Sequence, residues 1–262
     1  METLAADLRY ALRTMRSNIS FTGIAVVALA LGIGANTAIF TVVDAVLLQP
    51  LPYPQPDRIM KLGRRFRSQV GYSNSIPKYM AWRQNDVFEA MALYDFGALA
   101  MNLGSGDPPQ QVNGVHVSAD YFKVFGVTPI VGRTFSPVED LPNGPTVAVL
   151  GYGVWQSRFG ASRDVLGRPI LLNGVPYVVV GILQTGFHPD PEADLWIPLQ
   201  ADPNSVNQGH YLNVAGRLKR GVTVTAAQAQ MKVVGEQFRK AYPKWMDPEE
   251  SVGVVPMRVV PA

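Results

Sequence analysis

The sequence contains no cysteine and only three histidines among its 262 residues. The lack of cysteine excludes a disulfide framework, a cysteine nucleophile and thiolate metal ligands. Charge is also scarce, because the formal net charge is only +3 and no basic run exceeds two adjacent residues. A nucleic-acid-binding protein usually carries a much stronger basic footprint. The sequence therefore predicts no nucleic-acid partner.

Motifs that support common catalytic chemistry are missing as well. The sequence has no G-x-x-x-x-G-K-[ST] phosphate loop, no G-x-S-x-G nucleophile turn and no H-E-x-x-H zinc motif. His116 falls in a predicted strand and His210 precedes another, so both are interpreted as structural residues. The sequence therefore predicts no catalytic residues, no cofactor and no metal, and the chain is not expected to be an enzyme.

One acidic segment leaves an alternative open. The segment HPDPEAD, residues 188–194, begins at His188 and places Asp190, Glu192 and Asp194 at alternate positions. Such spacing can gather oxygen ligands for calcium, but the EF-hand pattern is absent, which favours a solvated, proline-broken loop. The alternative function is a membrane-anchored extracytoplasmic binding module or enzyme with a calcium-type loop at 188–194.

A long uncharged segment dominates the N-terminal part of the chain. No charged residue occurs between Arg16 and Asp44, and about 20 apolar residues suffice to cross a bilayer as a helix. A cleaved signal peptide has a shorter apolar region followed by a small-x-small site, and no clear A-x-A site follows here. The sequence therefore favours an uncleaved transmembrane helix over residues 19–47, with a secreted, processed domain as the weaker alternative.

Small and weakly polar residues interrupt this apolar segment. In a membrane helix, small residues spaced four apart allow another helix backbone to approach closely. The asparagine and threonine can hydrogen-bond to a neighbouring helix or to a carbonyl of their own helix. We therefore predict that the helix packs against other transmembrane helices. The predicted packing residues are Ala28, Gly32, Gly34, Asn36, Thr37 and Ala38.

The flanks of the segment predict its orientation. Residues 1–18 combine leucines at helical spacing with Arg9, Arg13 and Arg16 on another face, as in an amphipathic helix at a membrane surface. The positive-inside rule then places the N-terminus in the cytoplasm and the main domain outside it. Residues 48–57 contain four alternating prolines and are predicted to form a stiff exit linker.

Residues 58–262 show mixed strands and helices, which predicts an α+β domain of one or two lobes. Asn173-Gly174 between two apolar runs predicts a tight hairpin. Thr225 and Gln228 fit a capping box at the start of a helix that ends near Tyr242. We also expect one strand over 92–103, a helix over 152–159 that ends at Gly160, and helices capped by Ser75 and Ser118. Trp155 and Trp196 are expected in the core.

Several of these segments together resemble a known family, the MacB-type ABC transporter permeases, in particular the acidobacterial-type permeases. The similarity covers nearly the whole chain in order. It includes DLRYALRTMRSN, LGIGANTAIFTVVDAVLLQPLPYPQPDR, VSADYFKVFGVTPIVGRTFS, VAVLGYGVWQSRFGASRDVLGRPILLNGVPYVVVGIL, DLWIPL and AGRLKRGVTVTAAQAQMKVVGEQFRKAYP.

The resemblance implies an N-terminal transmembrane helix followed by a periplasmic core domain, in a permease of the cell inner membrane. Family members continue into a membrane domain with three more helices, and a separate cytoplasmic ATPase usually completes the transporter. The resemblance therefore implies three partners: that cytoplasmic ATPase, further permease helices from a longer chain or a second copy, and the lipid bilayer. It also implies mechanotransmission, in which ATP-driven movement reaches the periplasmic domain. The chain ends at MRVVPA, about where the later helices would be approached, and is expected to be a fragment of such a permease.

Overall fold

The structure is a computed structural model that describes residues 10, 13–43, 53–67, 69–104, 110–187 and 191–257. It divides into two compact units. One unit comprises Met1–Leu51 with Arg258–Ala262, and the other, called the body below, comprises Pro52–Met257. Each unit is described by itself.

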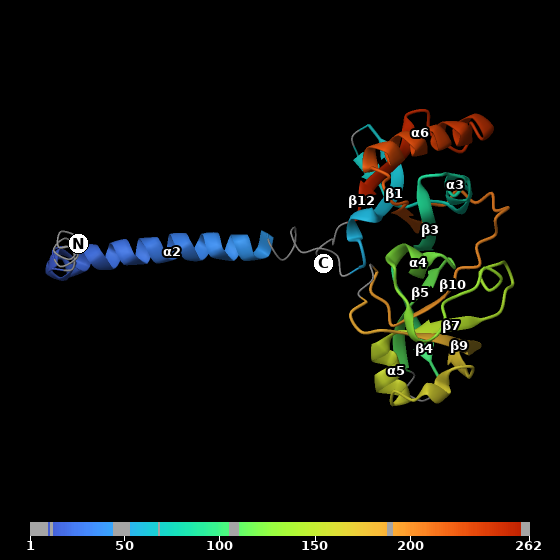
Figure 1. The fold of residues 1–262 in the computed structure, drawn as a ribbon, viewed down its shortest axis with the longest axis horizontal. Coiled ribbons are helices and arrows are strands. Elements are labelled where there is room, and N and C mark those ends of the chain that lie inside the picture. Colours follow the sequence, from blue (N-terminus) through green and yellow to red (C-terminus); the bar gives the residue numbers. More distant parts are fainter. Residues whose placement is uncertain are drawn as a thin grey trace. The chain divides into compact units, whose positions relative to one another are not determined.

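The first unit contains the long helix α2, Ile19–Val43, which Figure 1 draws as one unbroken helix. Its segment Ile19–Thr41 has a mean hydropathy of 2.0 and none of its residues is buried. By length and composition this helix is able to cross a membrane. Residues 13–17 are also helical, whereas most of the predicted surface helix over 1–18 lies outside the described residues.

The body begins and ends with a four-stranded antiparallel sheet. Its strand order is β12-β1-β11-β3, and a helix connects β1 to β3 and β11 to β12. This is the split β-α-β arrangement, in which the two strands of each β-α-β unit are separated by one strand of the other unit. The elements are β1 (Ile59–Phe66), α3 (Ile76–Trp82), β3 (Phe88–Asp95), β11 (Leu212–Leu218), α6 (Val224–Ala241) and β12 (Glu250–Pro256).

Both helices cover the same face of this sheet. Tyr79 of α3 and Met231 of α6 belong to one buried cluster with Met60 and Leu62 of β1 and Val252 of β12. In β1, β11 and β12 the apolar positions alternate, so that their side chains reach this cluster from every second position. We call this part of the body the sheet lobe.

A second lobe is inserted between β3 and β11. Six of its strands follow the order β10-β7-β9-β8-β4-β5, and a parallel pairing between β5 and β10 closes them into a ring. A separate buried cluster with residues from these strands and α5 fills this ring lobe. Its elements are β4 (Leu99–Leu103), β5 (Gln110–Val117), β6 (Pro129–Gly132), β7 (Val147–Leu150), α5 (Tyr152–Phe159), β8 (Pro169–Leu172), β9 (Val175–Leu183) and β10 (Leu195–Pro198).

Four short elements complete the body. The three-residue strand β2 pairs with β1, and β6 pairs with β9. The helix α4 packs against β3 and β11, close to where the chain leaves the sheet lobe. These four elements are β2 (Gln69–Gly71), η2 (Pro56–Arg58), α4 (Tyr121–Phe125) and η3 (Arg163–Val165).

Several local predictions are confirmed. The α+β class and the N-terminal apolar helix are both present. Asn173 and Gly174 have φ of 50° and 81°, the left-handed conformation that a type I′ hairpin requires, and they join β8 to β9. Trp155 and Trp196 are buried. The helix over 152–159 ends at Gly160, whose φ of 57° gives a left-handed C-cap.

Other local predictions are wrong. The strand predicted over 92–103 is two strands, β3 and β4, because the chain turns at Phe96 and Gly97. Ser75 is the N-cap residue of α3 as predicted, but its hydroxyl makes no cap hydrogen bond. Ser118 does not cap α4, because Asp120 occupies the N-cap position and the Ser118 hydroxyl accepts a hydrogen bond from the Leu93 N–H at 3.0 Å.

Candidate functional site

The chain enters the body through a short proline-rich segment, Tyr53–Arg58, which we call the exit segment. Tyr53 is only 6% exposed, although it lies between two prolines in a polar stretch. Its ring meets Phe125 of α4 at 5.1 Å and Phe187 at 5.8 Å between centroids. Burial of such a side chain stabilises the folded body by about 2–3 kcal/mol. The first residue of the exit segment is therefore part of the body's packed interior.

The Tyr53 ring belongs to an aromatic cluster that connects the two lobes. Phe125 contacts Tyr94 of β3, in the sheet lobe, at 6.3 Å between ring centroids. Phe187 contacts Trp196 of β10, in the ring lobe, at 5.5 Å. Edge-on and tilted pairs of this kind add about 0.5–1.5 kcal/mol each beyond burial of area. The exit segment is thus anchored where the two lobes meet.

A buried arginine holds the next residue of the exit segment. The Arg217 guanidinium on β11 donates from Nη1 to the Pro54 carbonyl at 3.0 Å and from Nε to the Val124 carbonyl at 2.7 Å. Burial and the nearby Arg58 lower the pKa of Arg217, while Glu89 raises it. An arginine stays charged even so. One side chain therefore joins the exit segment, the C-terminal end of α4 and the sheet.

Arg58 fixes the last residue of the exit segment to two strands of the sheet lobe, β11 and β3. Its Nε donates to the Leu218 carbonyl of β11 at 2.9 Å, and its guanidinium forms an ion pair with Glu89 of β3. Its Nη1 donates to the side chain of Gln55 at 2.6 Å. Glu89 also lies 4.0 Å from Arg217 and so faces both arginines. We call the exit segment together with Arg217 and Glu89 the exit clamp.

The two ends of the body lie on neighbouring strands. Met60 of β1 pairs with Pro256 of β12, and the Met257 N–H donates to the Ile59 carbonyl at 2.9 Å. A displacement applied at either end therefore acts on the same edge of the sheet lobe.

A buried ion pair connects α3 to the first residue of β12. Lys78 and Glu250 pair with side-chain exposures of 1% and 4%, and Lys78 Nζ lies 3.3 Å from His210 Nε2. Burial lowers the pKa of Lys78, and its partner Glu250 raises it. Burial, Arg64 and Lys78 lower the pKa of His210 to about 4, so the imidazole is neutral near pH 7. Breaking one partner of such a pair leaves an uncompensated buried charge, so we assign the pair a structural role.

The six predicted packing residues all lie on α2, and all are exposed. A side chain added at Gly32 or Gly34 meets no described atom within 4 Å of its Cβ. Thr37 donates its hydroxyl to the Ile33 carbonyl at 2.8 Å, which is one of the two roles predicted for it. With about 3.6 residues per turn, the small residues form two stripes on different sides of the helix. One stripe is Ala28, Gly32 and Asn36, and the other is Gly34, Thr37 and Ala38.

The calcium-type loop is only partly described, since residues 188–190 lie outside the described part of the chain. The Asp194 carboxylate accepts a hydrogen bond from the Asn113 N–H at 2.8 Å and so fixes the start of β10 against β5. Among the described residues, no three histidine or acidic side chains come together as metal ligands. His116 lies on β5 as predicted, with Nδ1 2.7 Å from Asp95 Oδ2 on β3.

Sequence reasoning missed the exit clamp. Its signals were weak but present: Arg217 is the single charged residue of YLNVAGRL, a strand that is otherwise uncharged, and Tyr53 is an aromatic residue within a proline-rich stretch. A lone charge in a strand that is buried along its whole length requires buried acceptors. The sequence could not identify those acceptors, because they are backbone carbonyls of residues far away in the chain.

Comparison with known protein families gives one broad match. The family model described as "MacB-like periplasmic core domain" matches residues 22–234. Among curated proteins, the macrolide export ATP-binding/permease protein MacB of Escherichia coli K12 is 30% identical over 137 residues, which are 51% of this chain and 21% of that protein. The corresponding protein of Shigella flexneri gives the same values. The matched region is thus about a fifth of the length of these curated relatives.

Solved structures share the fold. A domain of a permease from Porphyromonas gingivalis has a TM-score of 0.59 at 15% identity, covering 80% of this chain and 95% of that one. The periplasmic region of MacB from Actinobacillus actinomycetemcomitans has a TM-score of 0.54 at 18% identity, covering 78% and 90%. The extracellular domain of the noncanonic ABC-type transporter YknZ from Gram-positive bacteria has a TM-score of 0.53 at 14% identity, covering 74% and 99%.

Proposed function

The chain belongs to the family with the MacB-like periplasmic core domain, and from this we propose that it is a membrane permease subunit, or the N-terminal part of one, in an ABC-type transporter. In this proposal α2 lies in the inner membrane and the body is the periplasmic core domain. The proposed partners are a cytoplasmic ABC ATPase and further permease helices. The chain itself performs no catalysis and holds no cofactor.

We propose that the exit clamp passes movement into the body. The observation that carries this proposal is that Tyr53 is buried between the lobes while Arg217 holds the Pro54 carbonyl. Displacement of the exit segment then acts at once on β11, β3 and α4. Bonded and packed contacts of this kind transmit displacement because the elements that they join are rigid.

A distance measurement across the two lobes tests this role. The native chain lacks cysteine, so Gln156→Cys on α5 and Lys240→Cys on α6 introduce two unique labels at exposed positions. In membranes that contain the assembled transporter, ATP should change the distance between spin labels at these sites. Tyr53→Ala should abolish the change while the ATPase subunit stays bound. An unchanged response in Tyr53→Ala would contradict the role of the clamp.

We further propose that both stripes of α2 contact other membrane helices. Gly32→Leu and Gly34→Leu should each reduce co-purification of the permease partner, because close backbone approach requires small residues. Ile33→Phe is the matched control, since Ile33 lies between Gly32 and Gly34 in the sequence but on the side of the helix between the two stripes. If the wild-type chain remains a monomer in membranes and never co-purifies with an ATPase or a permease partner, the proposed function is wrong.

The proposed domain boundaries are 1–18 for a cytoplasmic-side amphipathic helix, 19–47 for the transmembrane helix, 48–57 for the linker, whose residues 53–57 belong to the exit segment of the body, and 58–262 for the periplasmic core. The proposed orientation is testable with single cysteines in otherwise cysteine-free chains. A membrane-impermeant maleimide added to intact spheroplasts should label Gln156→Cys in the body and spare Ser17→Cys. Labelling of Ser17→Cys alone would reverse the proposed orientation.

A further inference from the structure

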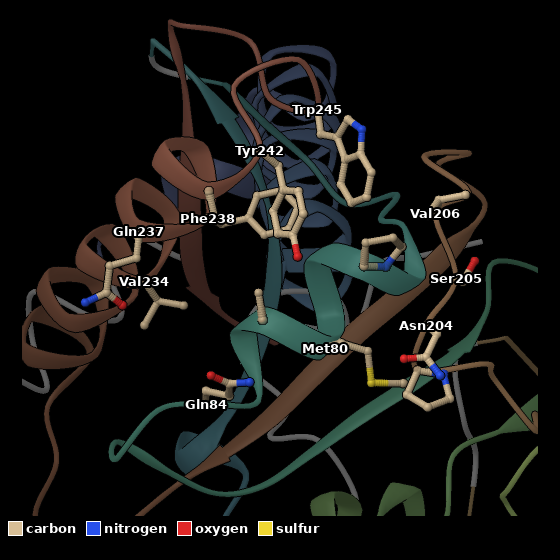
Figure 2. Close-up of a pocket in the computed structure, with 14 residues that line it drawn as sticks. Met80, Gln84, Asn204, Ser205, Val206, Val234, Gln237, Phe238, Tyr242 and Trp245 are labelled. Atoms are coloured by element: carbon tan, nitrogen blue, oxygen red, sulfur yellow. The ribbon is translucent and has the colours of Figure 1, made fainter.

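An open groove lies on the sheet lobe, and no residue of the exit clamp lines it. It is formed by α3, the loop over 203–206, and the C-terminal half of α6 with the turn that follows (Figure 2). Its volume is about 580 Å³, within the range of about 300–1,000 Å³ that is typical of small-molecule sites. We call it the aromatic groove.

Three aromatic side chains form one wall of this groove. The rings of Tyr242 and Trp245 stack with centroids 4.3 Å apart and an interplanar angle of 6°, and Phe238 lies 5.1 Å from Tyr242. Tyr242 remains 44% exposed despite this stacking. Figure 2 shows its hydroxyl pointing towards α3. The wall therefore offers an aromatic surface with a polar end.

Uncharged polar side chains surround this wall. The carboxamides of Gln84, Asn204 and Gln237 line the groove, and Figure 2 shows them spread around it. Neither these carboxamides nor the Tyr242 hydroxyl forms a hydrogen bond with another described residue. Each carboxamide offers both donors and acceptors. The groove thus presents several free hydrogen-bonding groups at different points around one aromatic surface.

No charged residue is among the described residues that line the groove, although 16% of the whole chain is charged. An anionic or cationic ligand would lose hydration there without gaining a counter-charge. A purely apolar ligand would cover the three carboxamides without satisfying them, at about 1–3 kcal/mol for each unsatisfied group. The lining therefore selects a neutral ligand that has both an apolar face and many hydroxyl groups.

We propose that the aromatic groove binds a neutral saccharide. A pyranose ring has a flat C–H face that packs on the exposed side of the Tyr242–Trp245 pair. Its hydroxyl groups both donate and accept, as the carboxamides of Gln84, Asn204 and Gln237 require. This binding does not depend on coupling to an ATPase, so it stands or falls separately from the proposed transport function.

Tryptophan fluorescence provides the test. Trp245 lines the groove and is half-buried, whereas Trp82, Trp155 and Trp196 are buried elsewhere. The full chain in lipid nanodiscs, free of sugar-based detergent, is titrated with maltotetraose and with tetra-N-acetylchitotetraose. At least one of the two should give a saturable change in emission that is confirmed by calorimetry. Gln237→Ala, an exposed substitution that leaves the core intact, should weaken binding about tenfold, and Tyr242→Ala should abolish it.

Tyr211→Ala is the matched control, because Tyr211 is 48% exposed and does not line the groove. It should leave the affinity unchanged. The proposal is overturned if neither saccharide binds at millimolar concentration, or if both groove variants bind as the wild type does. It is also overturned if n-decanol or a sulfated oligosaccharide saturates the site while the neutral sugars do not.

Discussion

Arg217 illustrates how a strand that is buried along its whole length can carry a charge. Its guanidinium donates to the carbonyls of Pro54 and Val124, so the charge is solvated by backbone dipoles instead of water. Val124 lies in the last turn of α4, where unpaired carbonyls carry partial negative charge. The side chain therefore satisfies a buried carbonyl in the last turn of α4 and a partly buried carbonyl of the exit segment.

Replacement of this side chain should destabilise the body. Arg217→Met keeps much of the buried volume but leaves the Pro54 and Val124 carbonyls without their donors and Glu89 facing only Arg58. Unsatisfied buried groups of this kind cost about 1–3 kcal/mol each, so we expect a loss of about 2–4 kcal/mol in urea unfolding of the full chain. Arg67→Met removes a guanidinium that is 83% exposed in its pair with Glu249, and should cost less than about 1 kcal/mol. Equal losses for the two variants would contradict the assignment.

Glu139 predicts a specific dependence of stability on pH. Its carboxylate accepts two hydrogen bonds from Arg133 and two from Ser136, all between 2.7 and 2.9 Å. The Arg133 bonds lower the pKa of Glu139 from 4.5 to about 2, with burial acting in the opposite direction. A group with a depressed folded-state pKa stabilises the fold above its unfolded pKa, and this contribution is lost as the pH falls towards the folded value.

Glu139→Gln should therefore be less stable than the wild type near pH 7, and this difference should shrink as the pH falls from about 4.5 to about 2. The measurement is the free energy of unfolding of both proteins across this range. Glu249→Gln serves as the control because that side chain is 63% exposed, and it should change stability little. A difference for Glu139→Gln that stays constant with pH would show that the hydrogen bonds do not favour the ionised carboxylate.

At the scale of single elements, α6 shows where local sequence rules reach their limit. The Thr225–Gln228 pair fits a capping box, yet the helix begins two residues earlier with Thr223 as its N-cap. The Thr223 hydroxyl accepts from the Ala226 N–H at 3.2 Å. Gln228 instead bonds the Val252 carbonyl and the Val254 N–H of β12, at 2.7 and 2.9 Å. A tertiary partner thus takes the glutamine that the local motif requires.

The two threonines give a matched pair of substitutions. Thr223→Ala should destabilise the protein by about 1 kcal/mol, because it removes the hydrogen bond at the helix N-terminus. Thr225→Ala should change stability by less than about 0.5 kcal/mol, since Thr225 is exposed in the first turn and alanine favours helix. Thermal unfolding of the full chain distinguishes them. A larger effect at Thr225 would restore the capping box predicted from the sequence.

At the scale of the whole molecule, the sequence predicted the parts better than their connections. The hairpin at Asn173-Gly174 and the helix that ends at Gly160 follow from local backbone requirements, so local reasoning identified them. The insertion of the ring lobe between β3 and β11 depends on pairings such as Val115 with Trp196, which lie far apart in the chain. Hydrophobic patterning gives the faces of these strands but does not name their partners.

The candidate site follows the same division. The packing role of the small residues of α2 is a prediction that rests on helical spacing, which alone places them on shared faces. The exit clamp was not recognised, because the partners of Arg217 are carbonyls and the partners of Tyr53 are rings from both lobes. Tyr53 and the Pro54 carbonyl, which the sequence analysis assigned to the linker, therefore contact the body's interior.

This integration of the exit segment predicts how the body responds to truncation. A fragment of residues 53–257 and a fragment of residues 59–257 both contain the two buried clusters, so both should fold. The shorter one lacks the Tyr53 ring and the Arg58 contacts and leaves Phe125 and Phe187 partly uncovered. Removal of a buried aromatic side chain costs about 3–5 kcal/mol, which lowers the melting temperature of a domain of this size by roughly 6–20 °C.

The longer fragment with Tyr53→Ala separates the ring from the rest of the segment. This substitution should produce most of the decrease in melting temperature seen in the shorter fragment. The reason is that Arg58 lies at the partly exposed margin of the exit clamp, while Tyr53 is buried within it. Pro54→Ala is the matched control, since its carbonyl still accepts from Arg217 and its side chain is exposed. Equal melting temperatures for the two fragments would mean that the exit segment does not stabilise the body. The exit clamp could then not transmit movement to the two lobes.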